Sequence, residues 1–172
     1  MDEPYLPLER DVVTSLVLSV FRLNGALLAA GDRLVGDLGL TSARWQVLGV
    51  IATAPVPLPI ASIARNMGLT RQAVRVVVHE LADAGLVRFA PNPHHRRAHL
   101  VMLTAEGTSA HRAARTRQGP WAAQLGRGIP AARLAEAAEL LHTLLLRLDE
   151  DDHVPHDASA PETKREEKAH EE

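Results

Sequence analysis

The sequence predicts a mainly α-helical protein with one small β-hairpin, and three observations lead to this fold class. Apolar residues recur at helical spacing in several separate segments of the 172-residue chain. Two short β-type runs, residues 86–90 and 98–103, flank the turn-rich segment PNPHHRR. Hydrophobic residues make up 46% of the chain but aromatic residues only 3%, so the core must be built from Leu, Val and Ala.

The first predicted element is a long helix from about Leu8 to Leu34. Its apolar residues repeat at alternating steps of three and four in a heptad-like seam: Val13, Leu16, Val20, Leu23, Leu27, Ala30 and Leu34. Gly36 or Gly39 ends the helix. Because so broad an apolar face must be buried and the chain is small, a second copy of the chain is its natural partner.

Three shorter helices are predicted next. Thr41 or Ser42 caps a helix that contains Trp45 and ends at the break at residues 55–57. The following helix spans about Leu58 to Met67, and Gly68 forms the turn after it. Thr70 then caps a helix from Arg71 to Ala84, whose inward face is expected to consist of Leu69, Val74, Val77, Val78 and Leu81.

The hairpin and two further helices complete the predicted elements. Thr104 caps a helix that opens at Glu106 and is expected to be interrupted at residues 119–120 and again at 126–130. A last helix starts near Pro130 and runs to about Leu148, with an apolar stripe of Leu134, Ala138, Leu141, Leu145 and Leu148. Pairing this helix and the first one across a dimer would bury both apolar faces.

These elements divide the chain into four predicted parts. Residues 1–39 form a dimerisation helix, and residues 105–149 form the C-terminal dimerisation helices. Residues 40–104 form a winged helix-turn-helix, because a supporting helix, a turn, a second helix and a hairpin follow one another there. Residues 150–172 are expected to be a disordered acidic tail, since they hold almost no large apolar side chains.

The charge is distributed unevenly along the chain. The net charge is −2, but from Asp149 onward ten acidic residues against three basic ones carry −7, which leaves +5 on residues 1–148. Between Leu58 and Leu100, six arginines against two acidic residues give +4. Such an asymmetry is typical of a protein that binds nucleic acid.

The residues predicted to contact DNA are polar and lie at helical spacing on the Arg71–Ala84 helix or at the hairpin tip. Arg pairs bidentately with guanine and Gln with adenine, so Arg71, Gln72 and Arg75 are the expected base-reading residues. Positive side chains on a narrow β-loop can enter the minor groove. The full set of predicted contacts is Thr70, Arg71, Gln72, Arg75, His79, Arg96 and Arg97.

Three longer stretches carry a resemblance to a known family. LTSARWQVLGVI, IASIARNMGLTRQAVRVVVHELADAGLVRF and NPHHRRAHLVMLTAEG together resemble the MarR (multiple antibiotic resistance regulator) family of transcriptional regulators over about residues 40–107. The resemblance implies a homodimer with interleaved terminal helices on a palindromic operator, usually as a repressor. It also implies a cleft for small, often phenolic or anionic, ligands that weaken DNA binding. The residues on the elements that line this cleft in the family are Phe21, Arg44, Trp45, His111 and Trp121.

The hairpin tip departs from the family pattern. Many members carry Asp-x-Arg there, and the Asp holds the Arg; the corresponding run in this chain is His95-Arg96-Arg97. Arg97 matches the family's wing arginine, but a histidine replaces its acidic partner. We therefore expect a less firmly organised wing, and we expect protonation of the wing histidines near pH 6 to tighten DNA binding.

No metal, cofactor or catalytic site is predicted. The chain has no cysteine, which excludes disulfides and Cys-ligated zinc, and His94, His95 and His99 lie in a turn without the rigid support that zinc requires. No phosphate loop or nucleophile elbow is present, so we do not expect an enzyme. The chain has no uninterrupted run of 18 apolar residues and no basic, apolar leader pattern, so we expect a cytoplasmic protein with no membrane role.

One alternative from another class remains open. The same winged-helix dimer could serve as a protein-interaction module with no role in DNA binding. A steep salt dependence of DNA affinity distinguishes the two functions, because it follows from counterion release.

Overall fold

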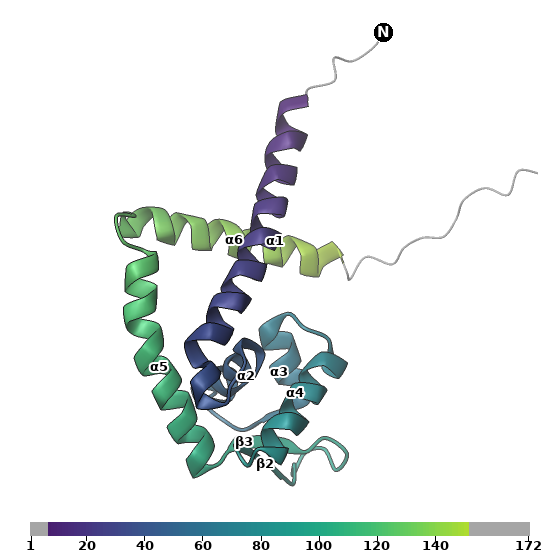
Figure 1. Cartoon of the computed structure of the whole chain (residues 1–172). Helices are drawn as coiled ribbons and strands as arrows, with labels where there is room; N and C mark the ends of the chain where they lie inside the picture. The colour runs from purple at the N-terminus through teal and green to yellow at the C-terminus, as the bar shows by residue number, and fades with distance from the viewer. Residues whose placement is uncertain (1–6, 152–172) are drawn as a thin grey trace, which may run out of the picture. The chain divides into compact units, whose positions relative to one another are not determined.

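The computed structural model describes the backbone of residues 7–151 and the side chains of residues 11–148. The chain divides into two compact units, with the boundary between Leu125 and Gly126. The first unit holds every element from the first helix to the fifth, and the second holds the last helix (Figure 1). The tail predicted to be disordered lies outside the described residues, except that the last helix continues to Asp151.

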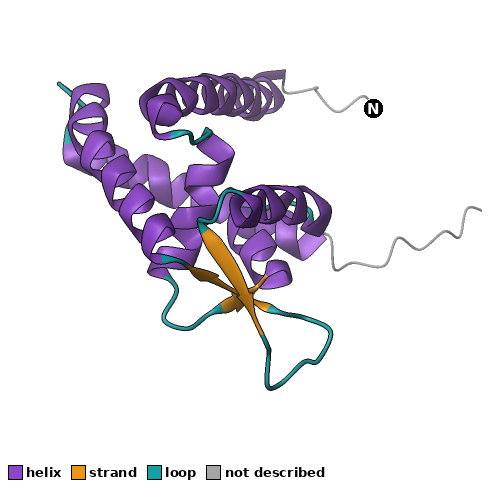
Figure 2. Cartoon of the chain, turned by 60° about the horizontal axis from the view of Figure 1, so that its bottom comes forward, coloured by secondary structure: helices purple, strands orange, loops and turns teal. Residues whose placement is uncertain are grey.

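The first unit follows the predicted order of elements. In chain order they are α1 (Pro7–Val35), the 3-10 turn η1 (Gly36–Leu38), α2 (Ser42–Thr53), β1 (Leu58–Pro59), α3 (Ile60–Met67), α4 (Arg71–Asp83), β2 (Val87–Ala90), β3 (Leu100–Leu103) and α5 (Ala105–Leu125). The second unit consists of α6 (Ala131–Asp151). The mainly α-helical fold with a small β-element is confirmed (Figure 2).

The core is aliphatic, as the composition predicts. Its largest fully buried side chains come from α1, α2, α3, α4 and β3: Val35, Val47, Leu48, Ile63, Val74, Val78, Leu81 and Val101. On α4, Val74, Val78 and Leu81 are buried, whereas Leu69 just before the helix is 49% exposed and does not belong to the predicted inward face. Truncating one of the buried leucines to Ala typically costs about 2–5 kcal/mol.

The β-structure is a three-stranded antiparallel sheet in the order β1-β3-β2, rather than a two-stranded hairpin. Leu58 and Pro59, which the sequence analysis placed in a helix, form β1 and pair with Val101 and Leu100 of β3. Helical backbone angles are disfavoured at Leu58 because a proline follows it. Pro59 cannot donate a ladder hydrogen bond, which restricts it to an edge strand such as β1.

Helix α5 passes through the predicted interruption at residues 119–120. Pro120 lies inside the helix, which ends only at Leu125, before Gly126. A proline removes one backbone hydrogen bond and crowds the preceding turn, but α5 continues past Pro120 despite this loss. The prediction of a break at Gly119-Pro120 is therefore wrong, whereas the break after Leu125 is confirmed.

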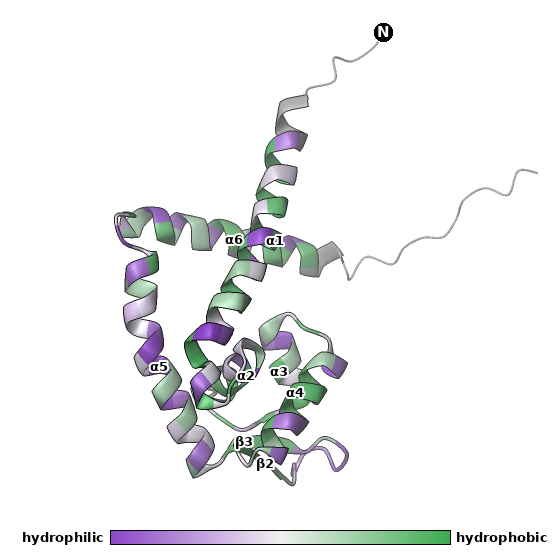
Figure 3. Cartoon of the chain, viewed as in Figure 1, coloured by the Kyte–Doolittle hydropathy of each residue, from purple (hydrophilic) through white to green (hydrophobic). Residues whose placement is uncertain are grey.

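Helix α1 contains many apolar residues (Figure 3), and several of its large apolar side chains are exposed. Val12 and Phe21 are both 68% exposed, and Leu23 is 53% exposed. An 18-residue window within Asp11–Leu38 has a mean hydropathy of 1.8, and this segment is long and apolar enough to span a membrane by length and composition. This criterion differs from the uninterrupted apolar run considered in the sequence analysis, and a helix with an exposed apolar seam meets it as readily as a membrane-spanning helix does.

Candidate nucleic-acid interface and ligand cavity

Helix α4 presents a polar face because its other face is anchored in the core. Gly68 ends α3 in the left-handed conformation at φ 62°, which turns the chain sharply into α4. The Thr70 hydroxyl accepts a hydrogen bond from the Ala73 amide at 3.2 Å and so caps the helix. With Val74 and Val78 buried, Arg71, Gln72, Arg75 and His79 are all exposed, as predicted.

The wing loop between β2 and β3 is organised by a residue that the sequence analysis did not single out. The Asn92 side chain accepts from the His94 amide at 3.0 Å, and the Asn92 carbonyl accepts from the His95 amide at 3.2 Å. The His95 carbonyl in turn accepts from the Ala98 amide at 3.0 Å. The Asn92 side chain and two backbone hydrogen bonds therefore hold two consecutive turns in the loop, without the acidic side chain of the family pattern.

Helix α4 and the wing meet at a concave surface of about 550 Å³, which we call the α4–wing concavity. Arg75 and His79 line it from α4, Arg97 and His99 from the wing, and Phe89 from β2. The Phe89 ring lies between the two imidazoles, with centroid distances of 5.3 Å to His79 and 6.4 Å to His99. The structure thus brings Arg75, His79 and Arg97 together from the predicted set.

The other predicted DNA contacts lie outside this concavity. Arg71 and Gln72 are exposed on the first turn of α4, and Arg96 is exposed on the wing loop beside Arg97. Phe89 and His99 were not among the predicted contacts. Phe89 lies between Arg88 and Ala90, and His99 lies between Ala98 and Leu100. Neither position belongs to a periodic pattern that would mark it in the sequence.

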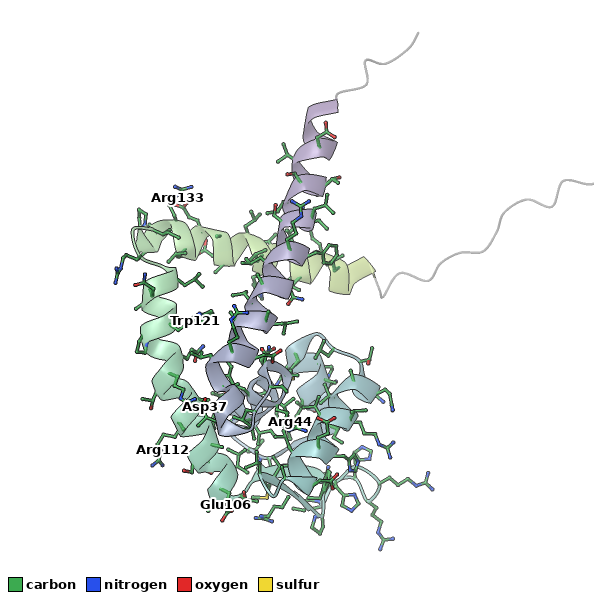
Figure 4. All side chains as sticks on the ribbon, in the orientation of Figure 1. Asp37, Arg44, Glu106, Arg112, Trp121 and Arg133 are labelled. Carbon is green, nitrogen blue, oxygen red and sulfur yellow. The ribbon has the colours of Figure 1, made fainter. Side chains whose placement is uncertain are left out.

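A larger cavity of about 720 Å³ opens among α1, α2, α3 and α5. Of the predicted ligand contacts, Trp45, His111 and Trp121 line it, and Trp121 lies on the inner side of α5 (Figure 4). The sequence analysis missed a set of carboxamides, one from each of the four helices: Asn24, Gln46, Asn66 and Gln118. No linear motif could reveal them, because only the fold brings these four helices together.

Two of the predicted ligand contacts lie elsewhere. Phe21 is exposed on α1 and does not line the cavity. The Arg44 guanidinium donates to a Glu80 carboxylate oxygen at 3.1 Å and so joins α2 to α4. Arg44 and Trp45 are neighbours on α2, and one residue turns a helix by about 100°, so they face different partners.

His111 and Arg115 lie one turn apart on α5 and border two cavities, the 720 Å³ one and a smaller one of about 450 Å³ beside β3. Burial lowers the pKa of His111 below 6.5, and the charge of Arg115 lowers it further. The imidazole is therefore biased toward its neutral form, whereas Arg115 remains a cation. This pair can offer an anionic or hydroxylated ligand one charge and one neutral hydrogen-bonding group.

The described residues contain two ion pairs and no cluster of side chains that could bind a metal ion. Besides Arg44 and Glu80, Arg117 of α5 pairs with Asp37 of η1, and this hydrogen bond lowers the pKa of the Asp37 carboxyl. No group of three or more His, Asp or Glu side chains among these residues is placed to hold a metal ion. Neither Arg75 nor Arg97 has an acidic partner within residues 11–148.

Comparison with known proteins identifies the domain that carries the concavity. The MarR family model matches residues 38–98, from η1 through the wing. A MarR family transcriptional regulator from Streptomyces coelicolor superposes with a TM-score of 0.65 at 26% identity, covering 82% of this chain and 96% of that one. Residues 38–98 of the chain therefore form a MarR-family domain.

Two curated relatives match part of this chain. An uncharacterised protein of Mycobacterium tuberculosis is 39% identical over 97 residues, which are 56% of this chain and 66% of that protein. The transcriptional activatory protein BadR of Rhodopseudomonas palustris is 26% identical over 99 residues, 56% of this chain and 57% of BadR. The chain thus spans just under two thirds of the first relative and less of the second.

A further solved structure shares the fold. CouR from Rhodococcus jostii RHA1, solved with p-coumaroyl-CoA bound, has a TM-score of 0.66 at 23% identity and covers 83% of this chain and 95% of that one. Its similarity extends through the terminal helices as well as the winged helix, because the coverage exceeds residues 38–98.

Proposed function

We propose that this chain is a sequence-specific DNA-binding transcription regulator. The observation that carries the proposal is the α4–wing concavity, where Arg75, His79, Arg97 and His99 from two elements converge on one surface. Arg71 and Gln72 extend the same exposed side of α4 toward its N-terminus, where a recognition helix reads base edges. The sequence charge of +4 between Leu58 and Leu100 supports this reading.

The active form is a homodimer on a palindromic operator. Exposed apolar side chains support it in each unit separately: Phe21 and Leu23 on α1, and Leu145 and Leu148 on α6. Surfaces of this kind are uncommon on monomeric soluble proteins unless they form an interface. Phe21→Asp should shift the protein to monomers in sedimentation equilibrium and weaken operator binding, whereas Val56→Asp, in the exposed loop before β1, should do neither.

Regulation is repression, relieved by a small molecule in the 720 Å³ cavity. The two indoles, the carboxamides and the His111–Arg115 pair favour a planar ligand with an anionic or phenolic group. The structure of CouR with p-coumaroyl-CoA bound supports a small-molecule ligand, whereas the transcriptional activatory protein BadR shows that the sign of regulation needs its own test. A promoter reporter tests the sign: loss of the protein raises transcription under repression and lowers it under activation.

Sequence-selective binding is tested by titrating operator and scrambled duplexes at several salt concentrations. Replacing both Arg71 and Arg75 by Ala should abolish the preference for operator, since each bidentate contact contributes about 1–3 kcal/mol of discrimination. Replacing both Arg112 and Arg133 by Ala is the matched control, because it removes the same two charges from exposed positions on α5 and α6 (Figure 4). Equal loss of preference in both variants would contradict the assignment of α4 as the reading helix.

The alternative function is a protein-interaction module that uses the winged helix without DNA. It predicts weak DNA affinity with no operator preference and no change on removal of Arg71 and Arg75. The convergence of cations from α4 and the wing favours the DNA-binding function. Cytoplasmic localisation is part of the same proposal, since a regulator must reach the chromosome.

A further inference from the structure

The α4–wing concavity has the features of a phosphate site. Two guanidinium groups, Arg75 and Arg97, and two imidazoles, His79 and His99, line it, and no carboxylate does among the described residues. The first turn of α3, at residues 59–61, closes its third side. The N-cap residue of α3 is a proline whose side chain caps nothing, so the positive end of the helix dipole adds to this surface.

The position of the concavity matches the position of a DNA strand. When a recognition helix lies in the major groove and a wing lies in the adjacent minor groove, the sugar-phosphate backbone that separates the grooves passes between them. In this chain the surface between α4 and the wing is the concavity itself. Base edges lie on either side of it, so its own ligand is backbone.

We propose that the α4–wing concavity binds a backbone phosphodiester of the operator through His79 and His99, and that this contact makes DNA affinity increase as the pH falls from 8 to 6. The inference rests on the proposed function and adds a pH-dependent phosphate contact to it. A protonated imidazole donates a charge-assisted hydrogen bond to a phosphate oxygen, and imidazole is the side chain that gains a proton in this pH interval.

Phe89 gives the two imidazoles a common support. Its ring is tilted 44° to His79 and 74° to His99, so the edge and face of one phenyl group contact both. His79 belongs to α4 and His99 to the wing, so a phosphate held by both fixes the wing relative to the recognition helix. This contact compensates for the acidic residue that is absent at His95 from the wing tip.

The charged groups that line the concavity beside the two imidazoles are both cations. Arg75 faces them from α4 and Arg97 from the wing, while residues 59–61 and Phe89 contribute no charge. His94 and His95 do not line the concavity, although they lie in the same loop. Of the wing histidines, only His99 is therefore expected to contribute to the pH dependence of DNA affinity, together with His79 of α4.

The test replaces single operator phosphates by neutral methylphosphonates and measures affinity by fluorescence anisotropy at fixed salt. For the wild-type protein, one or two adjacent positions per half-site should weaken binding roughly tenfold, the effect of one charge-assisted hydrogen bond. In the His79→Gln, His99→Gln double variant, the same substitutions should change affinity less than about twofold, and the salt slope should fall by about 1.

The pH profile supplies a second readout with a matched control. Wild-type affinity should rise from pH 8 to pH 6, the His79→Gln, His99→Gln variant should be flat, and a His94→Gln, His95→Gln variant should retain the wild-type profile. Unfolding midpoints of all three proteins, measured without DNA, check that the folds are equivalent. A flat wild-type profile, or equal methylphosphonate effects in wild type and the His79, His99 variant, would overturn the proposal.

Two further outcomes distinguish the ligand source and the underlying function. Inorganic phosphate is titrated into the DNA-free protein while the imidazole NMR signals are followed. Saturable shifts of His79 and His99 at millimolar phosphate that persist when operator DNA is bound would assign the site to free phosphate and contradict a DNA-backbone role. Absence of any operator preference in the wild type overturns the proposed function itself, whereas operator binding without the phosphate effect overturns only this inference.

Discussion

Replacing Gly107 by Ala should destabilise the junction between the sheet and α5. A Cβ built on Gly107 would lie 1.9 Å from the Leu86 carbonyl oxygen and 2.8 Å from its carbonyl carbon. Both are backbone atoms, so no side-chain rotation relieves the overlap. Either the start of α5 or the chain entering β2 must move by more than an ångström.

That movement breaks a specific set of hydrogen bonds. The Thr104 amide donates to the Leu86 carbonyl at 3.1 Å, the Thr104 hydroxyl donates to the Gly85 carbonyl at 2.8 Å, and the Gly107 amide donates to the Thr104 hydroxyl at 2.9 Å. Overpacking costs about 1–3 kcal/mol and each lost hydrogen bond about 0.5–1.5 kcal/mol. The expected loss is therefore about 3 kcal/mol, or a fall in Tm of roughly 6–12 °C for a chain of this size.

Urea and thermal unfolding at a fixed protomer concentration measure this effect, because dimer stability depends on concentration. Gly49→Ala is the matched control: its Cβ would meet only the His111 imidazole at 3.9 Å, an ordinary contact inside α2. It should stabilise the protein by about 0.5–1 kcal/mol, since Ala favours a helix interior over Gly. A Gly107→Ala protein as stable as the wild type would refute the described junction.

Three further predictions concern single contacts. Thr70→Ala should cost about 1 kcal/mol in urea unfolding through loss of the α4 cap; an unchanged midpoint would contradict the cap. A double-mutant cycle on Arg44 and Glu80 should give a coupling of about 0.2–1 kcal/mol, because both side chains are partly exposed; zero coupling would remove the link between α2 and α4. Because burial holds the pKa of His111 below 6.5 in the folded state, the unfolded chain takes up the proton first, and stability should fall as the pH drops through this range. His111→Gln should reduce that fall in unfolding free energy between pH 8 and pH 5, and identical pH profiles would contradict the shift.

The helices that the sequence predicts best are those with local signals at both ends. Thr41 caps α2 and Thr70 caps α4, each through its side-chain oxygen. Gly68 forms the turn between α3 and α4. The periodicity of α1 sets its length to within a residue or two of the structure. These features depend on residues less than a turn or two apart, which a single sequence displays directly.

The features that the sequence did not reveal depend on partners far along the chain. Strand β1 consists of two residues whose partners lie about forty positions later, and its apolar letters also fit a helix. Pro120 follows the rule for a break, but α5 continues past it, and its buried residues, Gly107 and Ala114, lie earlier in the helix. Arg44 carries the charge expected of a ligand contact, yet its distance to Glu80 became visible only when α2 and α4 were packed together.

The central proposal is that a symmetric dimer of this chain recognises DNA in a sequence-specific way. Selection of bound fragments from genomic or random DNA, followed by sequencing, tests it in one measurement. If a symmetric dimer reads the DNA, the selected fragments should share a palindrome whose half-sites are centred one helical turn, roughly 10–10.5 base pairs, apart. Recovery of fragments without a shared motif, or of a single asymmetric site, would contradict it.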